Sequence, residues 1–272
     1  MQTKPAIRSN LRMLIGKTYF ILKRYFLWLT LYSTYARKKD DVTLPYIIFK
    51  HKSLLFKDLQ NEKKYLQKNK VINLGIAIKK INHLLIKPGE LFSFWYLVGK
   101  PSAVKGYKTG MILHNGKIQE EVGGGLCQLS NLIYWMTLHT ELTVTERWRH
   151  NYDVFPDENR SVPFGSGATV AYNYVDLQIK NETNKAYQLS LQLNNQYLEG
   201  VWLSDMPAEY TYEVFEQDPR INTESWGGFT RHNKLFRQKK IQGKAIGEAE
   251  FICENNAFMM YNPLLGTQAL KK

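Results

Sequence analysis

The spacing of apolar residues changes near residue 140, and this change constrains the fold more than any other feature of the chain. Apolar side chains recur at helical intervals in residues 62–86 and 127–139. Beyond residue 140 they alternate in steps of two, which predicts the strands 142–149, 168–180, 186–193 and 197–203. The pattern therefore predicts an α+β protein, in which a helix-containing N-terminal half packs on a mainly antiparallel β-sheet.

Other segments complete this prediction. Residues 91–98 are aromatic and short, and we expect them to be extended. Residues 111–122 place Asn115-Gly116 between two apolar runs, which predicts a hairpin because both turn positions need a positive φ. Mostly strands are expected in the tail, 209–264. We divide the 272 residues into a basic amphipathic arm (1–60), a core domain (61–205) and a β-leaning C-terminal extension (206–272).

Positive charge is concentrated at the N-terminus. The first 70 residues hold 16 Lys and Arg against 4 Asp and Glu, whereas the rest of the chain holds 21 against 20. If residues 11–33 form a helix, the basic residues share one arc and apolar side chains cover the rest, which suits the surface of an anionic membrane. Packing of this helix on the protein's own core is the alternative. No nucleic-acid-binding pattern accompanies the charge.

The same segment does not match an export signal or a spanning helix. Lys17, Lys23 and Arg24 interrupt the apolar run, and no small-residue cleavage site follows it. We therefore expect a protein that is cytoplasmic or peripheral at the membrane surface.

Metal and cofactor sites are not predicted. The six His and two Cys residues show no zinc-site spacing. The glycine run is not followed by Gly-Lys-Ser/Thr, and no G-x-G-x-x-G is present, so nothing indicates nucleotide binding. Two cysteines, Cys127 and Cys253, cannot build a disulfide framework.

The strongest candidate for chemistry is the cysteine that follows a glycine run. Cys127 comes directly after Gly123–Gly125 and Leu126, at the predicted start of a helix, where the helix dipole and free amides lower a thiol pKa. His150, at the end of the next predicted strand, is a candidate base, and Asp176 and Asn181 are candidates to orient it. The alternative is a small buried hydrophobic cysteine.

Four stretches around these residues resemble the VanW family in sequence and order. They are PGELFSFW (88–95), GGGLCQLSN (123–131), ERWRH (146–150) and ATVAYNYVDLQIKN (168–181). The resemblance implies a bacterial cell-envelope context, a link to glycopeptide resistance, and an L,D-transpeptidase-like activity in which the motif cysteine is the nucleophile.

Carried onto this chain, the resemblance makes Cys127 the acyl-accepting thiolate and His150 its base. The family pattern has Asp before Ala-Thr-Val, whereas this chain has Gly167, so the orienting role is assigned to Asp176. The expected supporting residues are Gly123, Gly124, Gly125, Gln128, Ser130, Arg147 and Asn181.

Two functions follow as hypotheses. In the first, the thiolate of Cys127 attacks a carbonyl of a peptidoglycan stem peptide, D-alanine or another group leaves, and water or an amine resolves the thioester. In the second, the chain is a non-catalytic accessory protein that binds a wall precursor or a partner at the membrane surface. The partner expected in both is a peptidoglycan precursor or stem peptide.

Overall fold

The computed structural model describes residues 9–56, 64–114, 116–154 and 162–264. The central sheet has the order β1-β10-β9-β2, and all its pairs are antiparallel. Its strands are β1 (Tyr46–Leu54), β10 (Tyr197–Ser204), β9 (Tyr187–Leu193) and β2 (Leu84–Ile86). The first of them lies within the segment predicted as an N-terminal arm, so that segment contributes a strand to the central sheet.

Two helices pack on this sheet. Helix α4 (Cys127–Thr137) contacts β1 and β10, and helix α2 (Lys64–Ile81) contacts β9. The approach of α4 is close because Gly200 on β10 has no side chain, and a Cβ there would collide with Met136. Between the helices and the sheet lies the main hydrophobic core, in which Trp202, Phe92 and Phe94 are among the largest buried side chains.

Smaller sheets flank the core. One has the order β3-β8-β6, and a hairpin joins β4 to β5. Short helices connect these strands to their neighbours. The bounds are β3 (Leu91–Ser93), α3 (Phe94–Val98), η3 (Ala103–Lys105), β4 (Thr109–His114), β5 (Lys117–Val122), β6 (Thr143–Glu146) and β8 (Gln178–Lys180).

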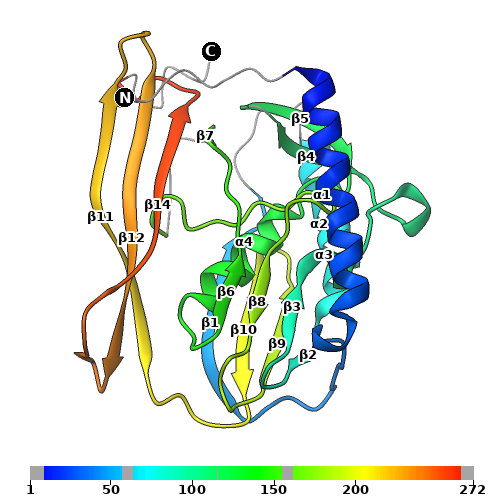
Figure 1. Cartoon of the computed structure of the whole chain (residues 1–272), viewed down its shortest axis with the longest axis vertical. Coiled ribbons are helices and arrows are strands. Elements are labelled where there is room, and N and C mark those ends of the chain that lie inside the picture. Colours follow the sequence, from blue (N-terminus) through cyan, green and yellow to red (C-terminus); the bar gives the residue numbers. More distant parts are fainter. Residues whose placement is uncertain (1–8, 57–63, 115, 155–161, 265–272) are drawn as a thin grey trace.

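A second large sheet is formed mainly by the C-terminal residues and stands beside the core (Figure 1). It has the order β11-β12-β14-β7, with β13 paired to β12, and the β14–β7 pair is parallel. The bounds are β7 (Tyr152–Asp153), β11 (Thr211–Thr223), β12 (Phe229–Ile241), β13 (Lys244–Ala245) and β14 (Glu250–Met259).

The predicted α+β class is confirmed, as are the helix that begins at Cys127 and the hairpin formed by β4 and β5. Asn115 of the predicted hairpin turn lies outside the described residues. The predicted strands 186–193 and 197–203 are present as β9 and β10, and the tail is rich in strands.

Three local predictions were wrong. The helix expected over 62–86 ends at Ile81, and 84–86 form β2, which pairs with β9. Residues 94–98, expected to be extended, form α3 because Ser93 caps the helix by accepting from the amide of Tyr96. Of the strand expected over 168–180, only β8 is regular, and the rest is held by isolated bridges.

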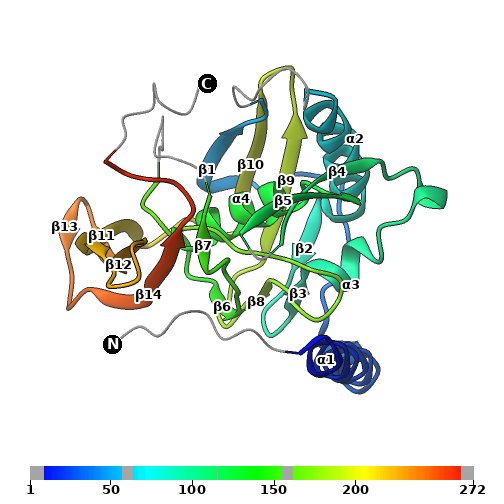
Figure 2. The ribbon, with the colours of Figure 1, turned by 90° about the horizontal axis from the view of Figure 1, so that it is seen from above.

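The N-terminal helix α1 (Asn10–Thr30) lies at the outer edge of the molecule, nearly along its long axis (Figures 1 and 2). A short 3₁₀ helix, η1 (Tyr32–Thr34), follows it. Ser9 caps α1 by accepting from the amide of Arg12 at 3.4 Å. Among the described helices, none combines the length and the apolar character needed to cross a membrane.

A buried arginine fastens α1 to the core. The Arg24 Nη2 atom donates to both carboxylate oxygens of Glu146 at 2.6 and 2.7 Å, and Nε donates to the carbonyl of Asn173 at 3.2 Å. One turn further, the Trp28 ring meets the rings of Tyr96 and Tyr172. The basic residues of the predicted arc thus face two ways, because Arg24 is buried against the protein whereas Arg12 and Lys23 are exposed to solvent.

Replacing Arg24 tests this attachment. Arg24→Ala leaves the partly buried Glu146 carboxylate without its charged partner, so we expect the free energy of unfolding to fall by about 3 kcal/mol. Urea unfolding followed by circular dichroism measures it. Lys23→Ala, at an exposed neighbouring position, is the control and is expected to change stability by less than about 0.5 kcal/mol. Equal effects of the two substitutions would contradict the prediction.

Candidate active site at the start of helix α4

The glycine run forms a tight turn pressed against β4. Gly123 and Gly125 have φ values of +85° and +95°, which L side chains rarely adopt. Gly124 lies so close to Gly110 on β4 that a Cβ on either residue would overlap the backbone of the other. The Asn73 Nδ2 atom on α2 donates to the carbonyl of Gly124 at 2.9 Å. The turn is therefore fixed from two sides.

Helix α4 begins at the end of this turn, with Cys127 as its first residue. The amide of Gln128 donates to the carbonyl of Gly125 at 3.1 Å. Within the described part of the chain, the amides of Leu126 and Cys127 donate to no acceptor on another residue. These amides and the positive end of the helix dipole surround the position that an anion at Cys127 would occupy.

The thiol itself is in a desolvated environment. Its Sγ atom lies 3.6 Å from the carbonyl oxygen of Val170 and donates to it. Burial raises the pKa of the Cys127 thiol, and backbone hydrogen bonds at Val170 and at Cys127 itself lower it by less. This direction is opposite to the lowered thiol pKa that we expected from the position of Cys127 at the start of a helix. The resting thiol is protonated at neutral pH.

The polar residues of the motif hold the helix in place. Gln128 Nε2 donates to Ser53 Oγ and to the carbonyl of Leu54, both at 2.9 Å, and so joins α4 to β1. Ser130 Oγ donates to the carbonyl of Ala168 at 2.6 Å, which brings the helix against segment 168–170. Gln128 thus fixes α4 to β1, and Ser130 fixes it to the segment that contacts the Cys127 thiol.

Segment 168–170 also pairs with the irregular residues between β6 and His150, although a strand was expected over 142–149 and β6 ends at Glu146. Trp148 pairs with Thr169, whose amide donates to the Trp148 carbonyl at 2.8 Å. Two residues later, His150 is half-buried, and desolvation, followed by the charge of Arg149, lowers its pKa. Both effects favour the neutral form of the imidazole. Cys127 and Trp148 thus contact consecutive residues of one segment, Val170 and Thr169.

Arg147, expected as a support residue, is surrounded by protein groups. Its Nε donates to the carbonyl of Gly167 at 2.8 Å, and Nη2 donates to that of Gly165. The guanidinium also lies 5.0 Å from the centre of the Tyr134 ring on α4. Arg147 thereby holds the backbone of Gly167, the position at which the family pattern has an acid.

Asp176 is fully buried beside the start of α3. Its Oδ1 accepts from the amides of Trp95 and Leu177 at 3.0 and 2.9 Å, and its Oδ2 accepts from Ser93 Oγ at 2.5 Å. Burial raises the pKa of Asp176 to about 6, although these hydrogen bonds and Arg24 act in the opposite direction. The Asp176 amide donates to Glu146 at 3.1 Å, which ties it to the end of β6.

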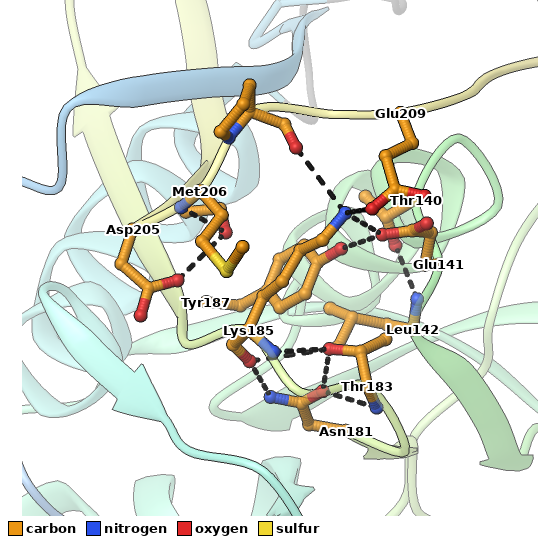
Figure 3. A network of polar contacts seen from close by, with 12 residues as sticks. Thr140, Glu141, Leu142, Asn181, Thr183, Lys185, Tyr187, Asp205, Met206 and Glu209 are labelled. Carbon is orange, nitrogen blue, oxygen red and sulfur yellow. Dashed lines mark hydrogen bonds and ion pairs between the residues drawn. The ribbon is translucent and has the colours of Figure 1, made fainter. Parts of the chain in front are cut away.

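Asn181 belongs to a different polar network, drawn in Figure 3. Its Nδ2 donates to the carbonyls of Ile86 and Lys185 at 2.9 and 2.7 Å. The buried Lys185 Nζ lies 2.9 Å from Glu141 Oε2, which also accepts from Tyr187 at 3.2 Å. These contacts join β9 to the segment that follows α4.

The structure thus places the predicted residues in two groups. Cys127 contacts Val170, and Trp148, two residues before His150, pairs with Thr169, whereas Asp176 and Asn181 sit in separate buried networks. Between the described residues, no hydrogen bond or ion pair joins Cys127, His150 and Asp176 to one another. The described residues also hold no group of three His, Cys, Asp or Glu side chains that could bind a metal ion.

Comparison with known proteins gives the class to which this fold and motif belong. A family profile described as VanW like protein matches residues 69–203, which include the glycine turn, Cys127 and His150. The chain belongs to the VanW family.

Two relatives carry the comparison further. The chain is 36% identical over 218 residues to the Vancomycin B-type resistance protein VanW of Enterococcus faecalis (strain ATCC 700802 / V583), covering 80% of this chain and 78% of that protein. It is 32% identical over 121 residues to the uncharacterized protein YoaR of Bacillus subtilis (strain 168), covering 43% and 37%. No solved structure matches the chain.

Sequence reasoning missed two supports of this site. Asn73 holds the glycine turn, and Arg24 was interpreted only as part of a surface stripe. Arg24 needs a partner because its guanidinium is buried, which the exposed basic residues of the same helix do not share. No local pattern identifies that partner as Glu146, 122 residues away.

The glycine turn can be tested by adding one methyl group. Gly124→Ala forces the turn away from Gly110, so we expect the free energy of unfolding to fall by about 1–3 kcal/mol. Gly75→Ala, inside α2, is the control, because its Cβ meets Leu193 at an ordinary 3.7 Å and favours the helix. Thermal unfolding of both variants measures the difference. A Gly124→Ala protein as stable as the control would contradict the close approach.

The raised pKa of Asp176 has a consequence for stability. Because the folded state holds its proton more tightly than the unfolded state, this contribution is complete below about pH 4 and is lost as pH rises through about 6. We expect the stability of the wild type relative to Asp176→Asn to fall by up to about 3 kcal/mol between those limits. Urea unfolding across that range measures it. A constant difference between the two proteins, or one that grows with pH, would contradict the raised pKa.

Proposed function

We propose that this VanW-family protein catalyses acyl transfer on peptidoglycan stem peptides, with Cys127 as nucleophile. The observation that carries the proposal is the position of Cys127, which a fixed glycine turn delivers to the start of α4 beside two amides that donate to no other described residue. Such amides can bind the oxyanion of a tetrahedral acyl intermediate. Cysteine acyltransferases likewise place their nucleophile at the start of a helix.

The substrate class rests on the family. The relative from Enterococcus faecalis is a vancomycin B-type resistance protein, and glycopeptide resistance concerns the cell wall. We therefore assign the stem peptide of a wall precursor as the acyl donor, in an L,D-transpeptidase-like reaction.

The protonated resting thiol requires a base during the reaction. His150, whose pKa is lowered, takes the thiol proton as Sγ bonds to the carbonyl carbon of the stem peptide. The carbon–nitrogen bond then breaks, and the imidazolium returns the proton to the leaving amine of D-alanine. Water or the amine of a second stem peptide attacks the thioester and releases Cys127 as a thiol. Asp176 serves as a positioning residue, because its amide holds Glu146 at the end of β6.

The proposal is tested by intact-protein mass spectrometry with a synthetic stem tetrapeptide. We expect wild-type protein to gain the mass of the acyl group and to release D-alanine, and Cys127→Ala to do neither. His150→Gln should lower the rate by a factor of about 100 or more. Cys253→Ala is the matched control and should react like the wild type. Activity of Cys127→Ala within about twofold of the wild type would remove Cys127 as nucleophile.

A non-catalytic accessory role is the second candidate, and the state of the thiol favours it. Cys127 Sγ donates to a carbonyl and burial raises its pKa, as in a packed structural cysteine. Under this alternative the stem peptide binds without forming an adduct, and Cys127→Ala retains the binding. Isothermal titration calorimetry of the two proteins with the same tetrapeptide therefore separates the candidates.

A further inference from the structure

Helix α1 exposes a continuous row of large apolar side chains. This outer strip consists of Leu11, Ile15, Leu22, Phe26 and Leu29, whose exposed fractions lie between 61% and 78%. Their spacing places them on one side of the helix. Exposed apolar rows of this kind mark binding surfaces for proteins or membranes.

The outer strip points away from the protein because the opposite side of α1 is already used. Arg24 is bound to Glu146, Trp28 packs against Tyr96, and Lys17 lies 5.3 Å from the centre of the Tyr174 ring. In Figure 2 the helix is seen nearly end-on at the margin of the molecule, beside α3. The protein's own core therefore cannot cover the strip without breaking the Arg24 contacts.

Positive charge borders the outer strip. Arg12 and Lys23 are exposed and follow strip residues directly in sequence, on its flank. Residues 10–30 contain no Asp or Glu, and the first 70 residues hold 16 basic residues against 4 acidic ones. An apolar face with basic borders is complementary to an anionic lipid surface, where side chains enter the headgroup boundary and the charges meet the phosphates.

We propose that α1 docks the protein on the surface of an anionic bilayer through the outer strip. The helix lies in the plane of the membrane, with the strip among the acyl chains and Arg12 and Lys23 at the headgroups. A second copy of the chain fits the surface less well, because pairing two such helices would bring basic borders together with no acidic residue to offset them.

The test uses the full chain and sedimentation with two kinds of vesicle, phosphatidylcholine alone and phosphatidylcholine mixed with phosphatidylglycerol. We expect binding to the mixed vesicles that weakens with added salt. Leu22→Glu/Phe26→Glu should weaken it by about tenfold or more, because two buried apolar side chains are lost. Arg12→Gln/Lys23→Gln should weaken binding to the mixed vesicles alone.

The matched control adds the same two negative charges as Leu22→Glu/Phe26→Glu, but outside α1. Val42→Glu/Val104→Glu alters two residues that are 76% and 99% exposed and lie outside α1, and it should bind like the wild type. Failure of the wild type to bind mixed vesicles, or equal loss in the control variant, would overturn the proposal. So would light scattering that shows a wild-type dimer split by Leu22→Glu/Phe26→Glu, because a second copy would then cover the strip. None of these readouts depends on Cys127 chemistry.

Discussion

The buried charge cluster of Arg24, Glu146 and Asp176 organises the part of the structure on which the site depends. Arg24 fastens α1, Glu146 is the last residue of β6, and Asp176 accepts from Ser93 and from the amide at the start of α3. Charges in a desolvated place are costly unless each has a partner. The cluster therefore makes the position of α1 depend on that of β6 and of the start of α3.

The surroundings of Cys127 and the exposed surface of α1 both depend on this cluster. Because Arg24 and Trp28 face the protein, the outer strip on the opposite side of α1 remains exposed. The cluster also holds the strand that pairs Trp148 with Thr169, next to Val170 and the Cys127 thiol. The proposed membrane docking and the proposed acyl transfer therefore both depend on the contacts of Arg24 and Glu146.

Much of the fold could be predicted from local patterns, and the failures have physical causes. The hairpin at Asn115-Gly116 and the helix at Cys127 are encoded by neighbouring residues. Residues 94–98 look extended because they are aromatic, but the carboxylate of Asp176 and the hydroxyl of Ser93 satisfy the first amides of a helix there. The first of these partners is more than eighty residues away, beyond the range of any sequence pattern.

The sequence by itself determined the fold class, the family and the place of Cys127 after a glycine turn, because periodicity, turn chemistry and motif order are local properties. Only the tertiary structure decided the ionisation of the thiol and the orientation of α1. Burial of Cys127 raises its thiol pKa by more than the backbone hydrogen bonds at Val170 and at Cys127 itself lower it. Likewise, Arg24 faces inward because it donates to Glu146, which lies on a strand distant in the sequence. Both outcomes depend on contacts between residues far apart in the chain.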